Sequence, residues 1–581
     1  MIHLSRQQDE MVYDAWYMTH EMLVNKMTPK TSTHRFSTLN RAQYIEQLSN
    51  TTFDLLIIGG GITGAGIALD AATRGLKVAL VEKKDFAWGT SSRSTKLIHG
   101  GLRYLKNLEF KLVHDVGTER AVVHENARHT VIPEKMLLPI IEKGSLSKSM
   151  TAWALWVYDR LAGVPAAERK RMLSVKDTIA AEPLIRQDVL KGGGLYFEYR
   201  SDDARLTIEV LKSAVEAGAV CLNYAMVSGL QYDAAGTINA AVVDDLLTNT
   251  KIEVKAKKVV NAAGPWVDTL RQLDTDGVKG KRLQLSKGVH IVVSRSRLPL
   301  HQSVYFDVDG DSRMIFAIPR ADVTYLGTTD TLYDDSIDQP EALQADIDYI
   351  LKAANYMFPT ADLKSEDVIS TWSGLRPLIY QEGRSVSELS RKDEIFHAPS
   401  GLISMAGGKL TGYRKMAEKV VNLVCKELKI KAKSKTKKFR VSGADFESDK
   451  AFDQFINLRA GQCKQLQASG KQITALAYRY GANIDLIIEK AFELYPQYQD
   501  KTLLLHAAEL SYAVEYESVA TLCDYLIRRS GRLYFERPAV KEVYPFIAAE
   551  MGKLLGWSEA QLAENLAEFE AEFDLVMSWA K

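Results

Sequence analysis

Up to about residue 440 the chain alternates between apolar patterns typical of strands and apolar residues at helical spacing. Beyond that point the helical spacing continues alone. The clearest stretch is FDLLIIGGGITGAGIALDAATRGLKVALVEKKD, residues 53–85. It holds an apolar run bounded by glycines, then small and apolar residues at helical spacing from Ile62 to Thr73, then KVALVE as a second apolar run. Uninterrupted apolar runs are typical of strands buried on both faces, and parallel strands need a crossover between them. The pattern therefore predicts a βαβ unit.

Later segments predict a largely antiparallel region and then a return to the first pattern. DDARLTIEVLKSAVEAGAV (202–220) predicts a capped helix that leads into a strand, and residues 239–260 predict a β-meander. Residues 283–330 predict antiparallel strands, whereas GLISMAGGKLTGYRKMAEKVVNLVCKELK (401–429) repeats strand, glycine turn and helix. After residue 440 the hydrophobic period is almost wholly helical, so we expect a domain boundary there.

These patterns divide the chain into four parts. Residues 1–35 mix acidic, basic and aromatic side chains without an apolar core, which predicts a poorly structured extension and argues against a secretory signal. FSTLNRAQYIEQL (36–48) predicts the first helix, and residues 36–428 hold the two interleaved patterns. Residues 429–440 form a lysine-rich linker without an apolar face, and residues 441–581 are expected to form a helical domain.

Composition narrows the class of protein. A chain of 581 residues is too long for one hydrophobic core, and 46% hydrophobic and 25% charged residues are ordinary for globular proteins. The net charge of +1 argues against a nucleic-acid partner. The four cysteines form no CxxC, so we expect neither a disulfide framework nor a zinc site, and the cytoplasm is the simplest location. No apolar stretch reaches the length of about 18 residues that a membrane span needs.

The βαβ unit carries a candidate dinucleotide site. Gly59-Gly60-Gly61-Ile62-Thr63-Gly64 fits GxGxxG between a strand and a helix. Gly59 allows the tight turn, Gly61 the close approach of a pyrophosphate, and Gly64 close helix–strand packing, while the helix N-terminus attracts the phosphates. Glu82 ends the second strand roughly 20 residues later, where an acid binds a ribose hydroxyl and repels a 2′-phosphate. The alternative, a glycine-rich turn without a ligand, leaves this acid unexplained.

Two later segments indicate that the ligand extends across the fold. VVNAAGPW (259–266) is an apolar strand that runs into Ala262, Ala263 and Gly264, small residues that a cofactor can approach closely. SMAGGKLTGYRK (404–415) places a helix N-terminus after Gly407 and Gly408, which suits a phosphate or an electron-poor ring. Taken singly, each segment is equally well explained as an ordinary tight turn.

A set of longer motifs resembles one known family. They occur in order between about residues 40 and 425 as GGGITGAGIALDAATRGLKVALVEKKDFAWGTSS, STKLIHGGLRYL, DDARL, VNAAGPWVD, KGVHIVV, LGTTDT, SGLRPL and AGGKLTGYRKMAE. Together with YAVEYESVATLCDYLIRR (512–529), they resemble the FAD-dependent glycerol-3-phosphate dehydrogenases. The resemblance implies an α/β fold: a glutathione-reductase-like FAD-binding Rossmann domain interleaved with an antiparallel-sheet substrate domain of the amino-acid-oxidase type, plus an α-helical C-terminal domain. No EF-hand loop follows residue 440, which points to the bacterial type.

The resemblance also implies which residues bind the cofactor, FAD. The serine- and threonine-rich stretch before residue 96 is expected to bind the phosphates and the ribityl chain, and the glycines at 100 and 101 to pass beside the flavin ring. The implied contacts are Ile58, Gly59, Gly61, Ile62, Thr63, Gly64, Glu82, Lys83, Thr90, Ser91, Ser92, Ser94, Thr95, Lys96, Leu97, His99, Gly100, Gly101, Ala263, Gly264, Trp266, Gly407, Gly408, Lys409, Leu410 and Thr411.

The implied substrate is sn-glycerol 3-phosphate, which is oxidised to dihydroxyacetone phosphate by hydride transfer from C2 to N5 of FAD. Arg376 and Arg391 are the candidates for its phosphate, because a guanidinium matches the geometry of a phosphate. Arg103 and Tyr104 are expected at the hydroxyl end, and Lys409 can reach either the substrate or the flavin. Arg103 and Lys409 are thereby also candidates for the catalytic set.

A general base must take the hydroxyl proton when the hydride leaves. His290 in KGVHIVV is the first candidate, because an imidazole titrates near neutrality. Read without the resemblance, His290 is better explained as a core histidine on a strand face. His99 is the second candidate, although its position in the loop suits contact with the flavin better.

The resemblance implies a membrane quinone as electron acceptor. Residues 143–171 cluster Trp153 and Trp156 among lysines and arginines, a composition that suits an interfacial helix on anionic lipid and equally a helix packed on the core. The protein is thus expected to be cytoplasmic, with a peripheral position on the inner face of the cell membrane as the open alternative. We also expect a homo-oligomer.

Two rival activities remain open at this point. One is a glycerol-3-phosphate oxidase, which uses O2 and makes H2O2, and the other an amino-acid or amine oxidase of the same fold. Oxidases of the first kind usually carry an insertion in the flavin-binding part, which this sequence lacks. The second activity needs a carboxylate clamp, whereas Arg103, Arg376, Arg391 and Lys409 together favour a phosphate.

Overall fold

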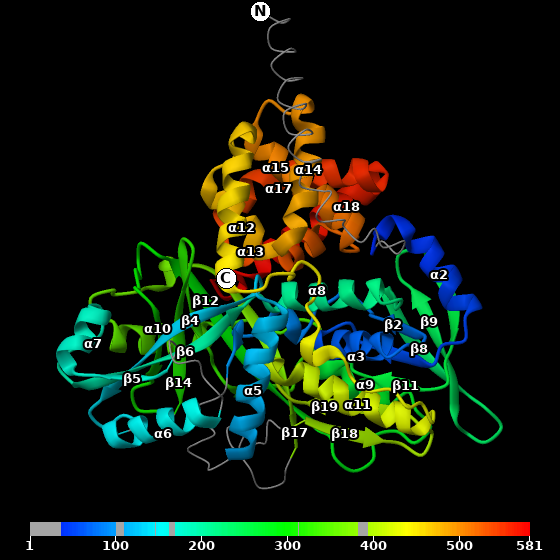
Figure 1. Cartoon of the computed structure of the whole chain (residues 1–581), viewed down its shortest axis with the longest axis horizontal. Helices are drawn as coiled ribbons and strands as arrows, with labels where there is room; N and C mark the ends of the chain where they lie inside the picture. Colours follow the sequence, from blue (N-terminus) through cyan, green and yellow to red (C-terminus); the bar gives the residue numbers. More distant parts are fainter. Residues whose placement is uncertain are drawn as a thin grey trace, which may run out of the picture.

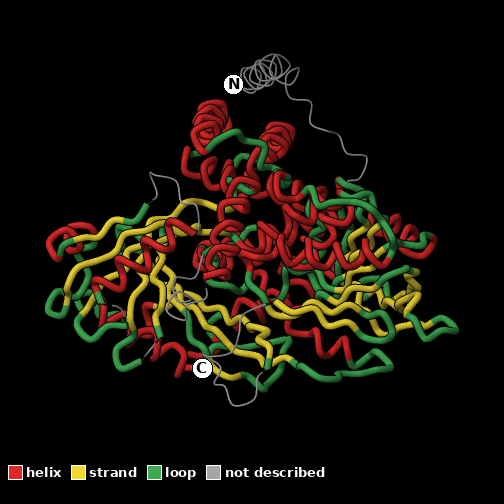
Figure 2. The backbone as a smooth tube through the Cα atoms, turned by 60° about the horizontal axis from the view of Figure 1, so that its bottom comes forward, coloured by secondary structure: helices red, strands yellow, loops and turns green. Residues whose placement is uncertain are grey.

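The computed structural model describes residues 36–99, 110–145, 147–161, 169–311, 313–380 and 393–580. Two sheet-containing halves lie side by side, and a bundle of helices from the C-terminal part of the chain stands on top of both (Figure 1). When the molecule is turned, strands are seen in both halves, with helices among and above them (Figure 2). Across the described residues, no helix has the length and apolar character needed to cross a membrane.

One half is built on a six-stranded sheet in the order β18-β19-β11-β1-β2-β7. All its neighbouring strands are parallel except β18 and β19. Every residue of β1 and β2 is buried, which explains the uninterrupted apolar runs of the sequence and confirms the predicted βαβ unit. The strands are β1 (Leu55–Ile58), β2 (Val78–Val81), β7 (Val220–Leu222), β11 (Val259–Asn261), β18 (Asp393–His397) and β19 (Ile403–Gly407).

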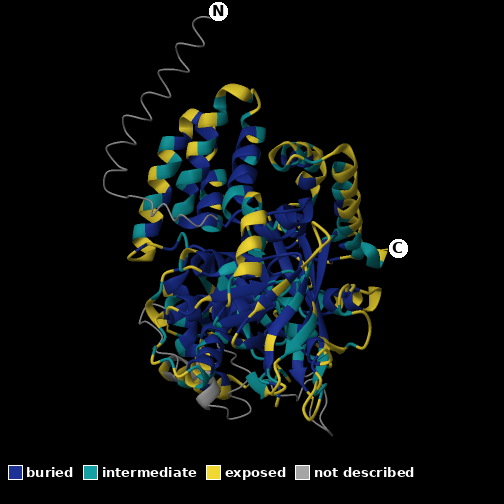
Figure 3. Cartoon of the chain, turned by 90° about the vertical axis from the view of Figure 1, so that its right-hand side faces the viewer, coloured by how far each residue is buried: buried dark blue, intermediate teal, exposed yellow. Residues whose placement is uncertain are grey.

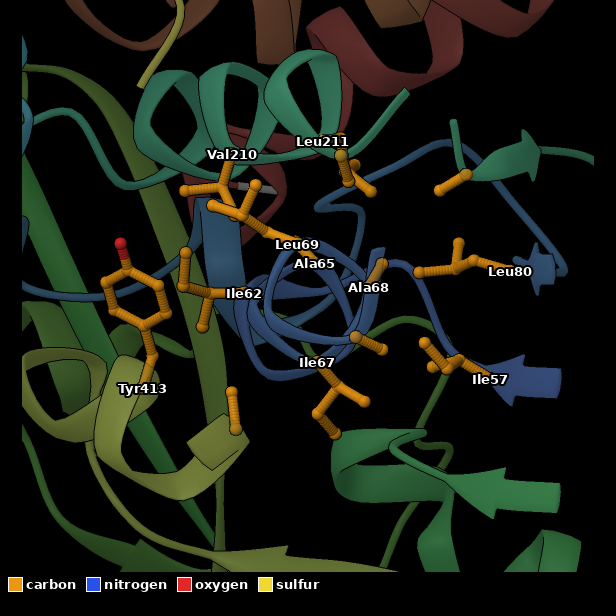
Figure 4. Packing of buried hydrophobic residues seen from close by; sticks show 14 of the residues in the cluster. Ile57, Ile62, Ala65, Ile67, Ala68, Leu69, Leu80, Val210, Leu211 and Tyr413 are labelled. Atoms are coloured by element: carbon orange, nitrogen blue, oxygen red, sulfur yellow. The ribbon is translucent and has the colours of Figure 1, made fainter. Parts of the chain in front are cut away.

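The crossover helix α3 (Ile62–Thr73) is buried on nearly all sides. It lies between the sheet, represented by Ile57 and Leu80, and the helices α8 (Asp203–Glu216) and α11 (Tyr413–Glu427) (Figure 4). Alanines and glycines dominate α3 because these neighbours approach it closely: a Cβ on Gly66 would lie 2.9 Å from the ring of Tyr413. The tight packing fixes the N-terminus of α3 relative to the sheet.

The other half is a ten-stranded mixed sheet. β13 and β4 pair in parallel, and the other strand pairs of this sheet are antiparallel, which agrees with the pattern predicted for residues 283–330. Its strands are β3 (Leu97–Ile98), β4 (Val131–Ile141), β5 (Arg171–Leu173), β6 (Leu190–Ser201), β12 (Leu283–Ser294), β13 (Ser303–Asp307), β14 (Met314–Arg320), β15 (Val323–Gly327), β16 (Thr331–Leu332) and β17 (Val368–Ile379). The helices of this half are α5 (Phe110–Asn126), α6 (Lys148–Leu161), α7 (Val175–Ala181) and α10 (Gln344–Met357).

The β-meander predicted over residues 239–260 is only partly correct. β8 (Ala225–Tyr232), β9 (Ile238–Asp245) and β10 (Thr250–Lys255) form a three-stranded antiparallel sheet, but β11 leaves it and joins the parallel sheet. The burial patterns of the two strands differ: β10 alternates between exposed and buried positions, whereas all three residues of β11 are buried. The first helix predicted is α2 (Arg41–Asn50), which packs on β10.

Every described element after residue 440 is helical, as the sequence pattern predicts. The bundle exposes its outer faces and buries its base against the two sheets (Figure 3). Its elements are α12 (Asp449–Gln462), α13 (Gly470–Tyr480), α14 (Ile484–Leu494), α15 (Lys501–Tyr516), the π-helix η12 (Asp524–Arg529), α16 (Arg532–Phe535), α17 (Arg537–Leu555) and α18 (Glu559–Leu575). The remaining short helices are α9 (Val267–Arg271) and the 3-10 helices η1 (Thr38–Asn40), η2 (Thr90–Ser92), η4 (Gly264–Trp266), η5 (Ser365–Asp367), η7 (Leu410–Gly412), η8 (Thr436–Lys438), η9 (Cys463–Leu466), η10 (Gly481–Asn483), η11 (Tyr495–Gln497) and η13 (Ser578–Ala580).

The lysine-rich segment 429–440 lies against the helices α3 and α5. Its lysines at 429, 431, 433 and 435 are exposed, while the residues between them face inward. Arg74 at the end of α3 donates to the carbonyl of Ala432 at 3.1 Å, and Asn126 at the end of α5 donates to the carbonyl of Thr436 at 3.0 Å. These contacts tie the segment to both helices along its length.

Candidate functional site

Two adjoining cavities lie between the parallel sheet and the mixed sheet. The larger, of about 480 Å³, begins at the glycine turn that joins β1 to α3, and the smaller, of about 230 Å³, lies against β12, β14 and β17. A long ligand in the larger cavity therefore reaches the smaller one. The two cavities share the wall formed by Thr90, Ser94, Pro377, Gly408, Lys409 and Leu410.

The glycine turn is packed so closely that side chains cannot replace its glycines. Gly59 has φ +115°, and a Cβ there would lie 2.6 Å from the carbonyl oxygen of Ala262. A Cβ on Gly64 would lie 1.9 Å from the carbonyl oxygen of Gly59. The N-terminus of α3 consequently opens into the larger cavity, where the N–H of Ile62 donates to Ser91 Oγ at 3.0 Å. This arrangement suits the phosphates of a dinucleotide.

Glu82 lies at the end of β2 and lines the same cavity. Its Oε2 accepts from the N–H of Gly60 at 2.7 Å, and its Oε1 accepts from the N–H of Lys84 at 3.0 Å. Burial raises the pKa of this carboxyl group above its ordinary value. Each oxygen retains a lone pair, so the carboxylate can hold the glycine turn and still accept a ribose hydroxyl.

Most predicted cofactor residues line the two cavities. Around the larger cavity lie Ile58, Gly59, Gly61, Ile62, Thr63, Glu82, Lys83, Thr90, Ser91, Ser94, Ala263, Gly264, Trp266, Gly407, Gly408, Lys409 and Leu410. Thr95, Leu97, His99 and Thr411 line the smaller one. Gly64 lies beneath the turn, and Ser92 and Lys96 line neither cavity. Outside the described residues lie Gly100, Gly101, Arg103, Tyr104 and Arg391.

Lys96, one of the predicted cofactor contacts, lies in a buried ion pair with Asp203. It is 3% exposed, has φ +57°, and its Nζ donates to Asp203 Oδ1 at 2.5 Å and to the carbonyl of Ser92 at 2.9 Å. The other oxygen of Asp203 accepts from both the N–H and the hydroxyl of Ser94, at 3.0 and 2.7 Å. The Lys96–Asp203 pair therefore shapes the turn that presents Ser94 and Thr95 to the cavities.

His290 lies on β12 and lines the smaller cavity. Its ring stacks on Trp372 at 4.8 Å between centroids, and its Nε2 lies 3.0 Å from Thr95 Oγ1. Its Nδ1 has no hydrogen-bond partner among the described residues. Burial, reinforced by the nearby charges of Arg376 and Lys96, holds the pKa of His290 well below its ordinary value. The imidazole is therefore neutral at neutral pH and can accept a proton.

Arg376 on β17 supplies positive charge to the smaller cavity. One of its terminal nitrogens lies 3.2 Å from Asp330 Oδ1, and the other donates to the hydroxyl of Thr328 at 3.0 Å. Gly288 makes room for it, because a Cβ there would lie 2.3 Å from the guanidinium. The side chain remains 22% exposed, so the guanidinium can still meet a ligand.

The sequence missed two further arginines that line this cavity, Arg93 after η2 and Arg313 on the loop before β14. Arg313 donates to Asp311 Oδ2 at 2.6 Å and to the carbonyl of Asp330 at 3.4 Å, so that Arg313 and Arg376 flank Asp330. Asp330 belongs to the quoted motif LGTTDT, whereas no motif marks Arg313. Other lining residues that sequence reasoning missed are Trp88, Gly89, Met226, Val227, Ser228, Met405, Tyr196, Glu198, Tyr305 and Phe316.

Comparison with known proteins gives the class to which this fold and site belong. The model of the family described as FAD dependent oxidoreductase matches residues 54–414, which include all the residues that line the two cavities except Met416. The model described as the C-terminal domain of alpha-glycerophosphate oxidase matches residues 434–562, within the helical bundle. The fold and the site thus define a FAD-dependent oxidoreductase.

More similar proteins narrow the class. The chain is 50% identical over 540 residues to an aerobic glycerol-3-phosphate dehydrogenase of Staphylococcus haemolyticus, covering 92% of this chain and 96% of that protein. The solved structure of a glycerol-3-phosphate dehydrogenase from Bacillus halodurans complexed with FAD is 44% identical, with a TM-score of 0.80 over 93% of this chain and 98% of that one. The chain therefore belongs to the aerobic glycerol-3-phosphate dehydrogenase family.

A more distant likeness concerns the fold alone. The L-alpha-glycerophosphate oxidase of Mycoplasma pneumoniae is 18% identical, with a TM-score of 0.53 over 66% of this chain and 97% of that one.

The walls of the larger cavity fit FAD. The glycine turn and the N-terminus of α3 suit its pyrophosphate, and the Glu82 carboxylate suits the hydroxyls of its ribose. Gly407 and Gly408, with φ +73° and +85°, form a bare turn on the side toward the smaller cavity, where a flat ring can approach the backbone. FAD bound in this way would have its redox-active end toward the smaller cavity, which His290 and Arg376 line.

Gly64→Ala should abolish stable FAD binding, because the added Cβ overlaps the carbonyl oxygen of Gly59 and must displace the glycine turn. Gly412→Ala is the matched control, since a Cβ at this nearby position meets no atom within 4 Å. Flavin absorbance per mole of purified protein measures the difference. A Gly64→Ala protein with full flavin content would contradict the packing argument.

Proposed function

We propose that the protein oxidises sn-glycerol 3-phosphate to dihydroxyacetone phosphate with FAD as cofactor and passes the electrons to a membrane quinone. The observation that carries the proposal is the smaller cavity, which combines the guanidiniums of Arg313 and Arg376 with the neutral imidazole of His290 at the end of the cofactor cavity. A phosphate dianion with a secondary alcohol has the charge and the transferable proton that such a cavity can bind. Family membership supports the same substrate.

The roles of the described residues follow from their charges. Arg376 brings positive charge to the phosphate. Its terminal nitrogens already donate to Ser286, Asp330, Thr328 and Thr329, so a direct contact requires the phosphate to replace some of these partners. Bound FAD supplies the acceptor for the hydride that leaves C2. His290 takes the hydroxyl proton: when its Nε2–H donates to Thr95 Oγ1, the lone pair on Nδ1 is not engaged by another described residue. The oxygen is thereby left to form the carbonyl of the product. Arg103, Tyr104 and Arg391 stay predictions for the same site, and Lys409 lies on the wall shared by the two cavities.

The helix α6 supports a position at the membrane surface. Ala154 and Leu155 face the core, and Leu155 packs toward Gly194 on β6, where a Cβ would lie 2.8 Å from it. On the outer side, Met150, Trp153 and Trp156 are 49%, 44% and 51% exposed. The helix thus combines both alternatives: one face belongs to the core, and the other offers aromatic residues with adjoining cations to lipid. We infer a cytoplasmic protein that binds peripherally to the inner face of the membrane. The homo-oligomer stays a prediction.

The helix α6 and the smaller cavity both contact the strand β6. Gly194, which contacts α6, and Tyr196, which lines the smaller cavity, are two residues apart on β6 and hence on one face of the sheet. A lipid-borne acceptor at α6 would therefore lie beside the cavity in which the substrate is oxidised. This favours a quinone over oxygen as acceptor, with the oxidase activity as the second candidate.

Anaerobic addition of glycerol 3-phosphate should bleach the flavin absorbance of the purified protein, because the hydride of C2 reduces FAD. An unchanged spectrum would reject the substrate. Reoxidation should then be much faster with a short-chain quinone than with dissolved oxygen. The reverse order, with formation of H2O2, would favour the oxidase. A glycine or proline substrate that bleaches the flavin would instead indicate an amino-acid oxidase.

Arg376→Met should raise the KM for glycerol 3-phosphate roughly 10- to 100-fold, because a hydrogen bond to a charged group contributes about 1.5–3 kcal/mol. Arg186→Met is the control: Arg186 pairs with Asp188 at the surface and lines neither cavity. Steady-state rates at several substrate concentrations give the KM. An unchanged KM would remove Arg376 from the phosphate site.

His290→Asn should slow flavin reduction at saturating substrate by roughly 10²- to 10⁴-fold, the usual contribution of a general base, while FAD stays bound. His129→Asn is the matched control, because His129 is equally buried and has a similarly lowered pKa but lines neither cavity. Stopped-flow absorbance measures the rate. Equal slowing by both substitutions would make His290 a structural residue.

In the native protein, protonation of His290 should not lower the limiting rate of flavin reduction between pH 8 and 6.5. The proton acceptor is the neutral imidazole, and because its pKa is lowered, this form disappears only when the pH falls below the ordinary histidine range, near 6.5. The pH profile of the limiting rate of flavin reduction tests this. An acid limb centred at or above pH 6.5 that is absent from His290→Asn would contradict it.

Replacing Trp153 and Trp156 with serine should weaken binding to vesicles that contain phosphatidylglycerol, because the exposed aromatic face is removed. Replacing Leu246 and Leu247 with serine is the control, as these leucines are 39% and 41% exposed but lie on the turn between β9 and β10. Co-sedimentation measures the bound fraction. Equal binding of both double variants would reject α6 as the lipid surface.

A further inference from the structure

The segment YAVEYESVATLCDYLIRR (512–529) carries charged residues that neither cavity uses. We propose that this part of the C-terminal bundle positions the cofactor-binding loop after β2, through a buried contact of Arg528 and Arg529 with Asp85. The two arginines are positioning residues: they act on FAD through the loop and do not touch the cavities themselves. The inference rests on FAD as the cofactor and is independent of the substrate and the electron acceptor.

Asp85 is held from several directions at once. Arg529 donates to both of its oxygens, at 2.6 Å to Oδ2 and 2.8 Å to Oδ1, and the Nε of Arg528 also donates to Oδ2. Asn223 adds a hydrogen bond to Oδ1 at 3.2 Å. Asp85 and Arg529 are completely buried, and Arg528 is 4% exposed. Although burial alone would raise the pKa of Asp85, the two guanidiniums outweigh it and keep the carboxyl ionised.

The arginines are themselves fixed within the bundle. The Nε of Arg529 donates to the carbonyl of Glu517 at 3.0 Å, and Arg528 donates to Asp524 at 2.7 Å. Asp524 also accepts from the hydroxyl of Tyr224 at 2.6 Å. The Glu517 carboxylate in turn pairs with Arg205 on α8 at 2.6 Å. Arg528 and Arg529 thus present their guanidiniums from a rigid support.

Asp85 lies at the centre of the loop that forms one side of the cofactor cavity. Glu82 precedes it by three residues, and Trp88 to Ser91 follow it on the cavity wall. The next residue, Phe86, is completely buried against Gly60: a Cβ on Gly60 would lie 2.6 Å from its ring. The N–H of Ala87 then donates to the carbonyl of Gly60 at 3.1 Å. A shift of Asp85 therefore moves both the glycine turn and the ribose-binding and phosphate-binding ends of the loop.

A buried carboxylate tolerates the loss of one cation poorly, because the remaining charge stays in a low-dielectric environment. Without Arg529, Asp85 has to take up a proton or turn toward water, and either change releases the loop. Loss of affinity for FAD is the expected result, since ligand affinity depends on groups held in place before binding.

The test compares two full-length variants with equal losses of buried charge. Arg529→Met removes the contact with Asp85. Arg532→Met is the matched control, because Arg532 is a buried arginine that pairs with Glu509 at 2.6 Å and with Tyr525 at 3.1 Å, both within the bundle. FAD is removed from each protein and titrated back, with quenching of flavin fluorescence as the readout at a temperature where both are folded. The rate of FAD release from the holoenzyme is measured in parallel.

We expect Arg529→Met to raise the dissociation constant for FAD by roughly tenfold or more, as loss of a supporting residue behind a ligand contact typically does at metal sites. Arg532→Met should lower the melting temperature of the protein and leave the dissociation constant within about twofold of the native value. Equal effects of the two variants on FAD affinity, or no effect of Arg529→Met, would overturn the proposal.

A double-mutant cycle tests whether the effect passes through Asp85. Asp85→Asn should weaken FAD binding on its own, and combining it with Arg529→Met should add little to either single change. Additive losses would overturn the proposed route. If Arg529→Met does not fold, Arg528→Met takes its place in both experiments, because it leaves the two bonds of Arg529 to Asp85 intact.

Discussion

The close packing of α3 against the parallel sheet is the constraint on which the rest of the site depends. Because Gly64 touches the carbonyl of Gly59, the helix begins directly above the ends of β1 and β11. This position directs the N-terminus of the helix into the larger cavity, where the N–H of Ile62 donates to Ser91. A bulkier turn would displace the helix, the loop after β2 and the wall shared with the smaller cavity together.

The local features were predictable from the sequence because they depend on neighbouring residues. The bounds of β1, α3 and β2 follow from burial on both faces, and the helical character of the C-terminal part follows from its period. Features that depend on distant partners were not. The position of Lys96 is set by Asp203, 107 residues later, and the strand β11 leaves the predicted meander because it pairs with β1. Arg313 lies at the cavity because the tertiary fold brings the loop before β14 there, and no sequence motif identifies this residue.

Burial has two effects in the smaller cavity. It keeps the imidazole of His290 neutral, and it strengthens the attraction between the guanidiniums and an anion. Positive charge on Arg376 disfavours a protonated imidazole beside it, so the cations that we propose for the substrate also keep His290 in the form that can accept a proton. The aromatic stack on Trp372 and the contact with Thr95 fix the ring in this environment. In the proposed mechanism, these surroundings leave the binding of the anion to the arginines and the transfer of the proton to His290.

The contact between Asp85 and the arginine pair joins positions 443 and 444 residues apart in the chain. During synthesis, the nucleotide-binding half leaves the ribosome long before Arg528 and Arg529 do. A nascent chain therefore holds Asp85 without its cations until the bundle has been made. If this contact positions the loop as proposed, acquisition of the flavin would be coupled to completion of the polypeptide, because a chain truncated before residue 528 lacks these ion pairs.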